Sequence, residues 1–232
     1  MIARLGDKRV KSSYTTIGLP SGYQQVEYIE SSGTQYIDTG IIPNTNTKIE
    51  AKVLITQHAS ADSYDSLFGT IERTTTNVQT FDIQMSPTNY FYFSSGEWGV
   101  DNISVASGIN TEYNISFSVN GQITVNGNSY TLTSGWDNTN SLTLSIFALH
   151  YFYDYFYSNY SYMKLYSFAI YDGNILVRNF IPCYRISDNV IGLYDLVNGA
   201  FYTNAGTGTF TKGSDVTSQN STQILSLYIK EN

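Results

Sequence analysis

Residues 113–133 read YNISFSVNGQITVNGNSYTLT and alternate apolar with polar side chains on both sides of Asn120-Gly121. Alternation with a period of two is typical of a half-buried β-strand. Asn-Gly is the dipeptide that suits a two-residue type I′ hairpin turn, in which both central residues need positive φ. A second such pair, Asn126-Gly127, follows at once. The segment therefore predicts a meander of three short antiparallel strands.

Similar short runs continue in both directions along the chain, and helical periodicity is almost absent. Further predicted strands are FDIQM, YFYF, SLTLSIFAL, KLYSFAIYD and LVRNFIP, and Asp172-Gly173 supplies another hairpin turn. Residues 48–55 read KIEAKVLI, which places one apolar set on a single face: Ile49, Ala51, Val53 and Ile55. Many short strands separated by Gly, Asn, Asp and Ser clusters predict an all-β sandwich.

The composition excludes several classes of protein. Of 232 residues, 15% are aromatic and only 13% are charged, and 12 basic against 19 acidic residues give a net charge of −7. The apolar content of 41% suffices for one sizeable core, which excludes a disordered or coiled-coil protein. A net negative chain argues against nucleic acid as the main ligand, because phosphate binding needs clustered Lys and Arg.

The cysteine count and the hydropathy of the chain exclude further kinds of site and of protein. Cys183 is the only cysteine, which excludes an internal disulfide and a cysteine-rich zinc site, and we expect it to be a small buried hydrophobe. No signal peptide is visible at the N-terminus. The most apolar run, residues 142–157, is too short and too polar to span a bilayer. We therefore expect a soluble protein with no membrane insertion.

Two segments of the chain resemble a known family. Residues 19–44 read LPSGYQQVEYIESSGTQYIDTGIIPN, and residues 164–210 read KLYSFAIYDGNILVRNFIPCYRISDNVIGLYDLVNGAFYTNAGTGTF. They resemble the opening and closing halves of concanavalin A-like (laminin-G-like) jelly-roll domains, which occur in phage virion proteins and gut bacterial surface proteins. The spaced elements YIE, GTQYI, FIPC and GLYD carry the resemblance.

The resemblance implies an antiparallel jelly-roll β-sandwich over residues 21–213. Residues 1–20 would then form an N-terminal arm, and residues 214–232 a C-terminal tail. It also implies scaffold roles for the residues that carry it. We expect Gly33 and Gly192 to serve backbone geometry, and Tyr36 and Tyr194 to pack in the core.

Catalytic motifs are absent from the sequence. A retaining glycosidase needs two carboxylates about 5 Å apart, and glycosidases of the resembling class often carry them as Glu-x-Asp-x-x-Glu, a string this chain lacks. FDIQM supplies Asp82 alone, and His58 and His150 fit no metal or triad spacing. We therefore predict no catalytic residues and a non-enzymatic protein, with a carboxylate pair from distant strands left open.

No cofactor and no metal ligand are predicted, although a structural calcium ion at a sheet rim is left open. Sandwich domains of the resembling class often bind calcium through Asp, Asn and backbone carbonyls. The alternative is that these polar residues hydrogen-bond their own turns. The candidates by residue type alone are Asp62, Asp65, Asp137, Asn138 and Asn140.

Residues 150–162 read HYFYDYFYSNYSY, and neither the scaffold nor the family explains them. If extended, this segment puts alternate tyrosines on one face. Tyr, Ser and Asn are also the residues that antibody binding loops favour. The alternative is a long hairpin whose rings pack on the sandwich or on a neighbouring subunit. The predicted ligand-binding residues are Tyr151, Tyr153, Asp154, Tyr155, Tyr157, Asn159, Tyr160 and Tyr162.

Together the residues and the resemblance favour a non-enzymatic recognition or decoration protein of a phage virion, such as a head or tail decoration, fibre or receptor-binding protein. Its aromatic segment would bind a glycan or host-surface receptor. Residues 1–20 and 214–232 would anchor it to other virion subunits in particles assembled in the host cytoplasm, and a homo-oligomer is left open. The alternative is a bacterial cell-surface carbohydrate-binding or adhesin module, and the third option is a glycoside hydrolase of the same fold.

Overall fold

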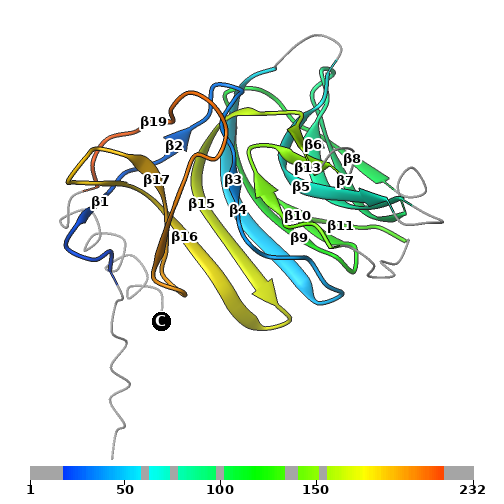
Figure 1. The fold of residues 1–232 in the computed structure, drawn as a ribbon. Helices are drawn as coiled ribbons and strands as arrows, with labels where there is room; N and C mark the ends of the chain where they lie inside the picture. The colour runs from blue at the N-terminus through cyan, green and yellow to red at the C-terminus, as the bar shows by residue number, and fades with distance from the viewer. Residues whose placement is uncertain are drawn as a thin grey trace, which may run out of the picture.

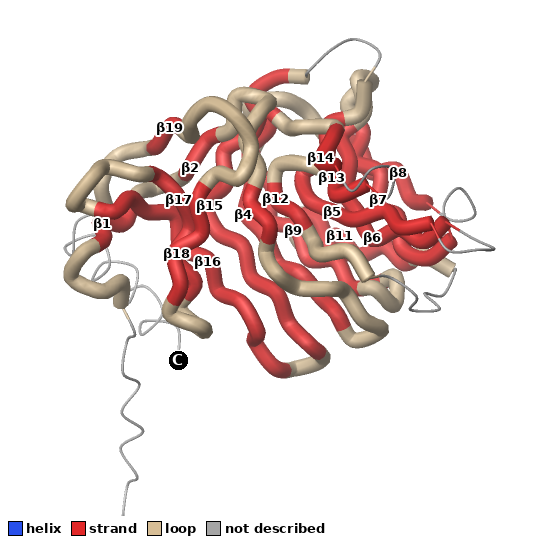
Figure 2. Tube along the Cα trace, in the orientation of Figure 1, coloured by secondary structure: helices blue, strands red, loops and turns tan. Residues whose placement is uncertain are grey.

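The computed structural model describes residues 18–58, 63–73, 78–97, 102–133, 141–151 and 156–216. These residues form strands and loops and no helix (Figure 2). Consequently, no helix in the described part of the chain is long and apolar enough to cross a membrane. The strands make two sheets that pack face to face around one core (Figure 1), so the predicted all-β sandwich is confirmed.

The larger sheet holds eleven of the described strands. Its main path runs β11 (Asn128–Thr131), β10 (Gln122–Val125), β9 (Glu112–Ser118), β4 (Thr47–Gln57), β15 (Tyr162–Asp172), β16 (Ile175–Arg185), β17 (Ile191–Asp195) and β18 (Ala200–Thr203). Beside this path, β1 (Tyr23–Gln25) pairs with β16, and β2 (Ile29–Glu30) pairs with both β15 and β19 (Thr211–Lys212). The first and last described strands thus belong to the same sheet.

The smaller sheet holds the other eight described strands. Its main path runs β14 (Phe156–Ser158), β13 (Leu149–Tyr151), β5 (Asp65–Arg73), β6 (Val78–Met85), β7 (Tyr90–Glu97) and β8 (Asn102–Ala106). The short strand β12 (Ser145–Ile146) joins β5 to β3 (Ile37–Asp38). The pairing of β13 with β5 is parallel, whereas the other strand pairs are antiparallel.

The ends of the described chain are fastened to each other. The backbone N–H of Val216 donates to the carbonyl of Gln25 at 2.9 Å, and that of Glu27 donates to Ser214 at 3.0 Å. Backbone pairing with the sandwich therefore continues as far as Val216. Most of the expected arm and tail, residues 1–17 and 217–232, lies outside the described residues.

The two Asn-Gly pairs make different turns. Asn126 and Gly127 have φ of 48° and 83°, so a two-residue turn with both central residues at positive φ joins β10 to β11, as predicted. The type I′ prediction for Asn120-Gly121 is wrong. There the loop has three residues and Gly121 carries the positive φ, 84°, after a turn in which its N–H donates to Ser118 at 2.8 Å.

The predicted single strand SLTLSIFAL is also wrong, because the chain bends at Phe147. This residue has φ of 72° and separates β12, which is antiparallel to β5, from β13, which is parallel to it. Its ring is fully buried and lies 5.0 Å from that of Phe210, so core packing fixes the bend. A change of strand direction of this kind leaves no trace in apolar periodicity.

The core lies between the sheets and is dominated by phenylalanine. The rings of Phe81 and Phe117 stack at 4.8 Å between centroids, and Phe68 and Phe168 pack edge to face at 5.7 Å. The predicted inward face of β4 is confirmed, because Ile49, Ala51, Val53 and Ile55 all belong to this core. Cys183 is fully buried as predicted, and burial raises the pKa of its thiol to about 12.

The scaffold roles implied by the resemblance hold for three of four residues. A Cβ on Gly33, at φ of 88°, would lie 2.3 Å from the ring of Tyr162, and one on Gly192 would lie 2.3 Å from a backbone oxygen. Tyr194 is buried as expected. Tyr36 is not, because it alternates with the buried Gln35 and Ile37 and its half-buried side chain faces away from the core.

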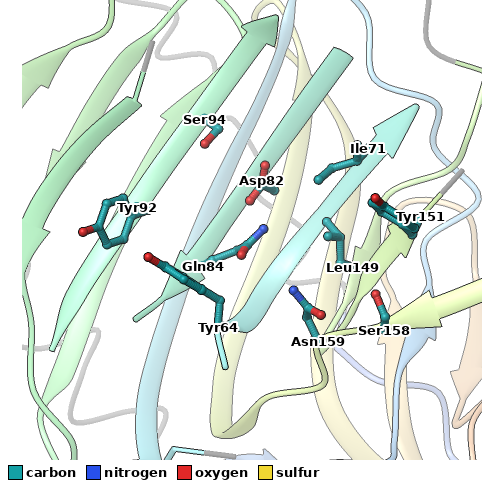
Figure 3. Close-up of a pocket in the computed structure, with 10 residues that line it drawn as sticks. All are labelled: Tyr64, Ile71, Asp82, Gln84, Tyr92, Ser94, Leu149, Tyr151, Ser158 and Asn159. Carbon is teal, nitrogen blue, oxygen red and sulfur yellow. The ribbon is translucent and has the colours of Figure 1, made fainter. Parts of the chain in front are cut away.

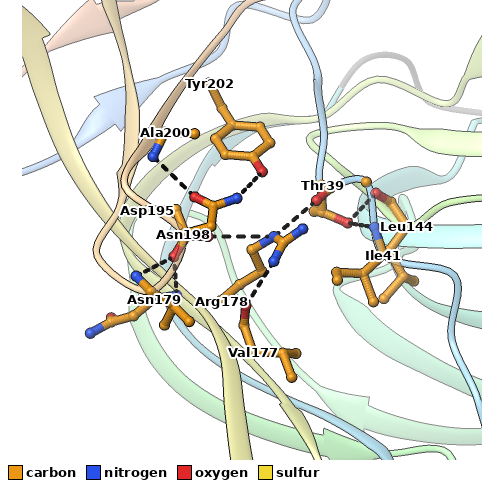
Figure 4. Close-up of polar contacts among 12 residues, drawn as sticks. Thr39, Ile41, Leu144, Val177, Arg178, Asn179, Asp195, Asn198, Ala200 and Tyr202 are labelled. Carbon is orange, nitrogen blue, oxygen red and sulfur yellow. Dashed lines mark hydrogen bonds and ion pairs between the residues drawn. The ribbon is translucent and has the colours of Figure 1, made fainter.

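The buried carboxylate of Asp195 connects strands β16 and β17 (Figure 4). Asp195 at the end of β17 accepts hydrogen bonds from the backbone N–H groups of Asn179 at 2.8 Å and Val197 at 3.0 Å. Its other oxygen lies 3.4 Å from Nε of Arg178. Arg178 also donates to the carbonyl of Thr39, so the same group links β16 and β17 to the chain that follows β3.

We expect Asp195→Ala to lower the free energy of unfolding by about 3 kcal/mol, because it removes the acceptor of two backbone N–H groups and the carboxylate partner of the Arg178 guanidinium from a buried position. Urea denaturation of wild type and variant measures this loss. Asp188→Ala is the control, since it removes an exposed carboxylate whose ion pair with Arg185 is open to solvent. An equal loss of stability in both variants would contradict the role of Asp195.

Candidate functional site

A pocket of about 640 Å³ opens on the outer face of the smaller sheet (Figure 3). Its volume lies within the range of small-molecule sites, which are typically about 300–1,000 Å³. Strands β5, β6 and β7 and the hairpin β13–β14 all contribute to it. The lining residues are Tyr64, Ile71, Asp82, Gln84, Tyr92, Ser94, Leu149, Tyr151, Ser158 and Asn159.

Strand alternation directs the polar floor of this pocket outward. In β6, Phe81 and Ile83 belong to the core, so Asp82 and Gln84 face the other way. In β7, Phe91 and Phe93 point inward in the same manner, which leaves Tyr92 and Ser94 on the outer face. Pairing of Asp82 with Ser94 and of Gln84 with Tyr92 sets these four side chains beside one another.

The carboxyl group of Asp82 sits at the base of the pocket and is only 2% exposed. The side chain of Asp82 packs directly against the backbone of Gly69, its pairing partner on β5. A Cβ on Gly69 would lie 2.3 Å from the Cβ of Asp82. Burial raises the pKa of Asp82 to about 7, although hydrogen bonds from Thr80 and Gln84 act in the opposite direction. The pocket therefore contains a carboxyl group that changes its charge near neutral pH.

Tyrosine rings stand on two sides of this floor. Tyr64 and Tyr92 pack edge to face at 5.5 Å between centroids, and Tyr64 is 42% exposed. Tyr151 and Asn159 lie on the opposite side (Figure 3). The backbone carbonyl of Asn159 accepts a hydrogen bond from Ser66 at 2.7 Å, which fixes the end of the β13–β14 hairpin to β5. Polar groups and aromatic faces thus converge on one space.

Two of the predicted ligand-binding residues, Tyr151 and Asn159, line the pocket. Tyr160 packs 6.3 Å from the ring of Tyr36, and Tyr162 covers Gly33, so both have structural contacts elsewhere. Tyr153, Asp154 and Tyr155 lie outside the described residues, and only the backbone of Tyr157 is described.

Tyr151 and Tyr157 do not lie on one continuous strand. Tyr151 pairs with Phe156, and His150 pairs with Tyr157, so the chain reverses direction between Tyr151 and Phe156. The alternative hairpin conformation is what the structure has. Tyr151 and Tyr157 therefore belong to separate strands, and the described part of the hairpin supplies one wall of the pocket.

The floor and the opposite wall were not predicted from the sequence, in which Asp82 stood out only as a carboxylate without a catalytic partner. The alternation in TFDIQM and YFYFSS already indicates these floor residues, because each segment carries a second set of side chains on the face opposite its phenylalanines. Tyr64 gave no comparable signal, since it precedes β5 in a connection whose geometry the sequence does not determine.

The described residues contain no group of three or more His, Cys, Asp or Glu side chains placed to hold a metal ion. Among the calcium candidates, Asp65 is described; it is fully buried, with its carboxylate 3.5 Å from Nδ1 of His58. The other candidates, Asp62, Asp137, Asn138 and Asn140, lie outside the described residues.

The raised pKa of Asp82 predicts a pH dependence of stability. The folded protein keeps this proton to a higher pH than the unfolded chain does, so unfolding releases it between about pH 4 and pH 7. The free energy of unfolding should fall as the pH rises through this window, by at most about 1.4 kcal/mol per pH unit from this group.

Asp82→Asn removes this contribution. In urea denaturation, the variant should gain stability relative to wild type when the pH is raised from 5 to 7.5. A difference between the two proteins that is the same at both pH values would show that the carboxyl group titrates normally.

Comparisons with known proteins show the fold alone. No family model matches the chain, and no curated protein matches its sequence. A Bacteroides ovatus ATCC 8483 protein, provisionally described as carbohydrate-binding, matches 83% of this chain with a TM-score of 0.50 and 12% identity, and this chain spans 62% of its length. The Caenorhabditis elegans galectin LEC-6 matches 65% of this chain and 96% of its own, with a TM-score of 0.37 and 17% identity. The chain accordingly has a β-sandwich fold that is also found in a protein described as binding carbohydrate.

Proposed function

We propose that this chain is a non-enzymatic glycan-binding module and that the pocket on the smaller sheet is its binding site. The observation that carries the proposal is the pair of tyrosine walls around a polar floor. Support for the ligand class comes from the Bacteroides ovatus protein of similar fold, which is described as carbohydrate-binding.

The chemistry of the pocket matches that of a pyranose ring. Such a ring has apolar C–H faces and hydroxyl groups around its edge. Tyr64, Tyr92 and Tyr151 offer flat apolar surfaces with hydroxyl groups at their tips. Between them, Gln84 and Asn159 carry amides that both donate and accept hydrogen bonds. A few polar groups in an aromatic-lined hollow are typical of small-ligand sites.

Glycan-array binding by wild type and by single Tyr64→Ala, Tyr92→Ala and Tyr151→Ala variants tests the site. We expect each variant to lose about tenfold in affinity for the glycans that wild type binds, because a few aromatic side chains carry much of the binding energy at an interface. Tyr171→Ala is the control, since Tyr171 lies on the outer face of the larger sheet beside Glu50.

Two results would count against this site. Unchanged binding in all three variants would place the glycan elsewhere, and absence of binding to any glycan would reject the proposal.

A glycoside hydrolase is the second candidate, and Asp82 is the observation that favours it. A carboxyl group with a pKa near 7 in a pocket has the property of a general acid. Hydrolysis by the usual routes needs a second carboxyl group, and Asp82 is the only one among the described lining residues. Release of reducing sugar from a polysaccharide by wild type, lost in Asp82→Asn, would establish a hydrolase; we expect none.

The biological setting remains a proposal of its own. We place the module on a phage virion, with residues 1–20 and 214–232 as anchors to other subunits, and a bacterial cell surface is the alternative. The basic residues Arg4, Lys8, Arg9 and Lys11 near the N-terminus suit an acidic partner surface. Neighbouring genes for capsid or tail proteins would support the first setting, and adhesin or polysaccharide-utilisation genes the second.

A further inference from the structure

Positive charge is almost absent from the half of the chain that builds the pocket. Residues 53–163 contain one basic residue, Arg73, and nine acidic ones. They include seven of the eight described strands of the smaller sheet. The remaining cations in the described sandwich belong to strands of the larger sheet: Lys48, Lys52, Lys164, Arg178, Arg185 and Lys212.

The lining of the pocket follows this distribution. Asp82 is its one ionisable acid, and no lysine or arginine occurs among the described lining residues. The internal segments outside the described residues, 59–62, 74–77, 98–101, 134–140 and 152–155, also contain no lysine or arginine in their sequence. Arg73 is the nearest exception along β5. It is exposed, at the last position of that strand and two residues beyond Ile71.

This arrangement is unfavourable for an anionic ligand. Sites for carboxylate or sulfate groups rely on charge-assisted hydrogen bonds from Arg or Lys. An anion in this pocket would lose its hydration without gaining such a partner. Above neutral pH it would also be repelled by the carboxylate of Asp82. Over several ångströms at a protein surface, repulsion between two like charges changes affinity by about tenfold.

We propose that the pocket selects uncharged glycans and rejects glycans that carry carboxylate or sulfate groups, and that Asp82 sets this selection. The inference rests on the proposed glycan-binding function and adds the chemical class of the ligand. An uncharged sugar gives hydroxyl groups to the amides of Gln84 and Asn159 and to the carboxylate of Asp82, and it brings no charge that the site must neutralise.

The test compares neutral and acidic sugars of the same ring type at pH 8. The probes are immobilised oligomers of glucose, mannose and galactose together with oligomers of glucuronate, mannuronate and galacturonate. Wild type should bind at least one neutral series and bind its uronate counterpart at least tenfold more weakly. Asp82→Asn should reduce this preference about tenfold, measured as the ratio of the affinities of one protein for the neutral series and for its uronate counterpart.

Two further variants make the result independent of the folding of Asp82→Asn. Ser94→Lys puts a cation on the strand position that pairs with Asp82, and it should raise affinity for the uronate series. Glu50→Gln removes an acid from the outer face of the larger sheet, where Glu50 pairs with Lys48, and it should leave the preference unchanged.

The failures of the two proposals are distinguishable. If neutral glycans bind but uronates bind equally well, or if the preference survives both Asp82→Asn and Ser94→Lys, the charge selection is wrong and glycan binding stands. Uronate binding that disappears in Arg73→Gln would likewise overturn the selection, because it would assign the anion to the strand end. If neither series binds, both proposals fall.

Discussion

The stacked rings of Phe81 and Phe117, 4.8 Å apart at an angle of 30°, join the middle of the smaller sheet to the larger one. Around them Phe68, Phe93 and Phe168 complete an aromatic layer between the sheets. This layer fixes the register of β6, since a slip of one residue would exchange every inward side chain for an outward one. The outward position of Asp82 is therefore a consequence of core packing. The strands that form the pocket floor carry core residues on their other face, so core packing alone holds their backbone in place.

Burial of the Asp82 carboxyl group is unfavourable for folding. A buried carboxyl group is costly unless it is paired, and no lysine or arginine lines its pocket in the described structure. The site is nevertheless shaped for it, because Gly69 leaves the space that its Cβ occupies and Thr80 donates to it. Departures from the rules of stability are expected where a residue serves function. Asp195 offers the contrast, since this buried carboxylate has two backbone N–H donors and Arg178 and thus contributes to the scaffold.

Most of the fold could be predicted from the sequence, because alternation and turn residues act locally. KIEAKVLI, FDIQM and YFYF each form part of a strand, KIEAKVLI has the expected face inward, and Asn126-Gly127 makes the expected turn. Features set by distant contacts could not be predicted. The bend at Phe147 depends on core packing, and the connection that places Tyr64 beside Tyr92 depends on two strands that meet only after folding. Of the residues that line the candidate site, the tyrosine-rich run predicted Tyr151 and Asn159, whereas the polar faces of β6 and β7 were not predicted.

That wall has a particular place in the architecture. Strand β14 ends the described order of the smaller sheet, and β13 separates it from β5. A hairpin at a sheet edge tolerates changes in sequence better than a central strand, because fewer neighbours constrain it. Tyr151 and Asn159 from this hairpin nevertheless share a pocket with Asp82 and Gln84 from a central strand. In the proposed glycan site, a polar floor held by core packing thus meets an aromatic wall supplied by the edge of the sheet. Under the proposed function, substitutions in the hairpin would alter which sugar is bound without changing the register of β6, on which the proposed charge selection depends.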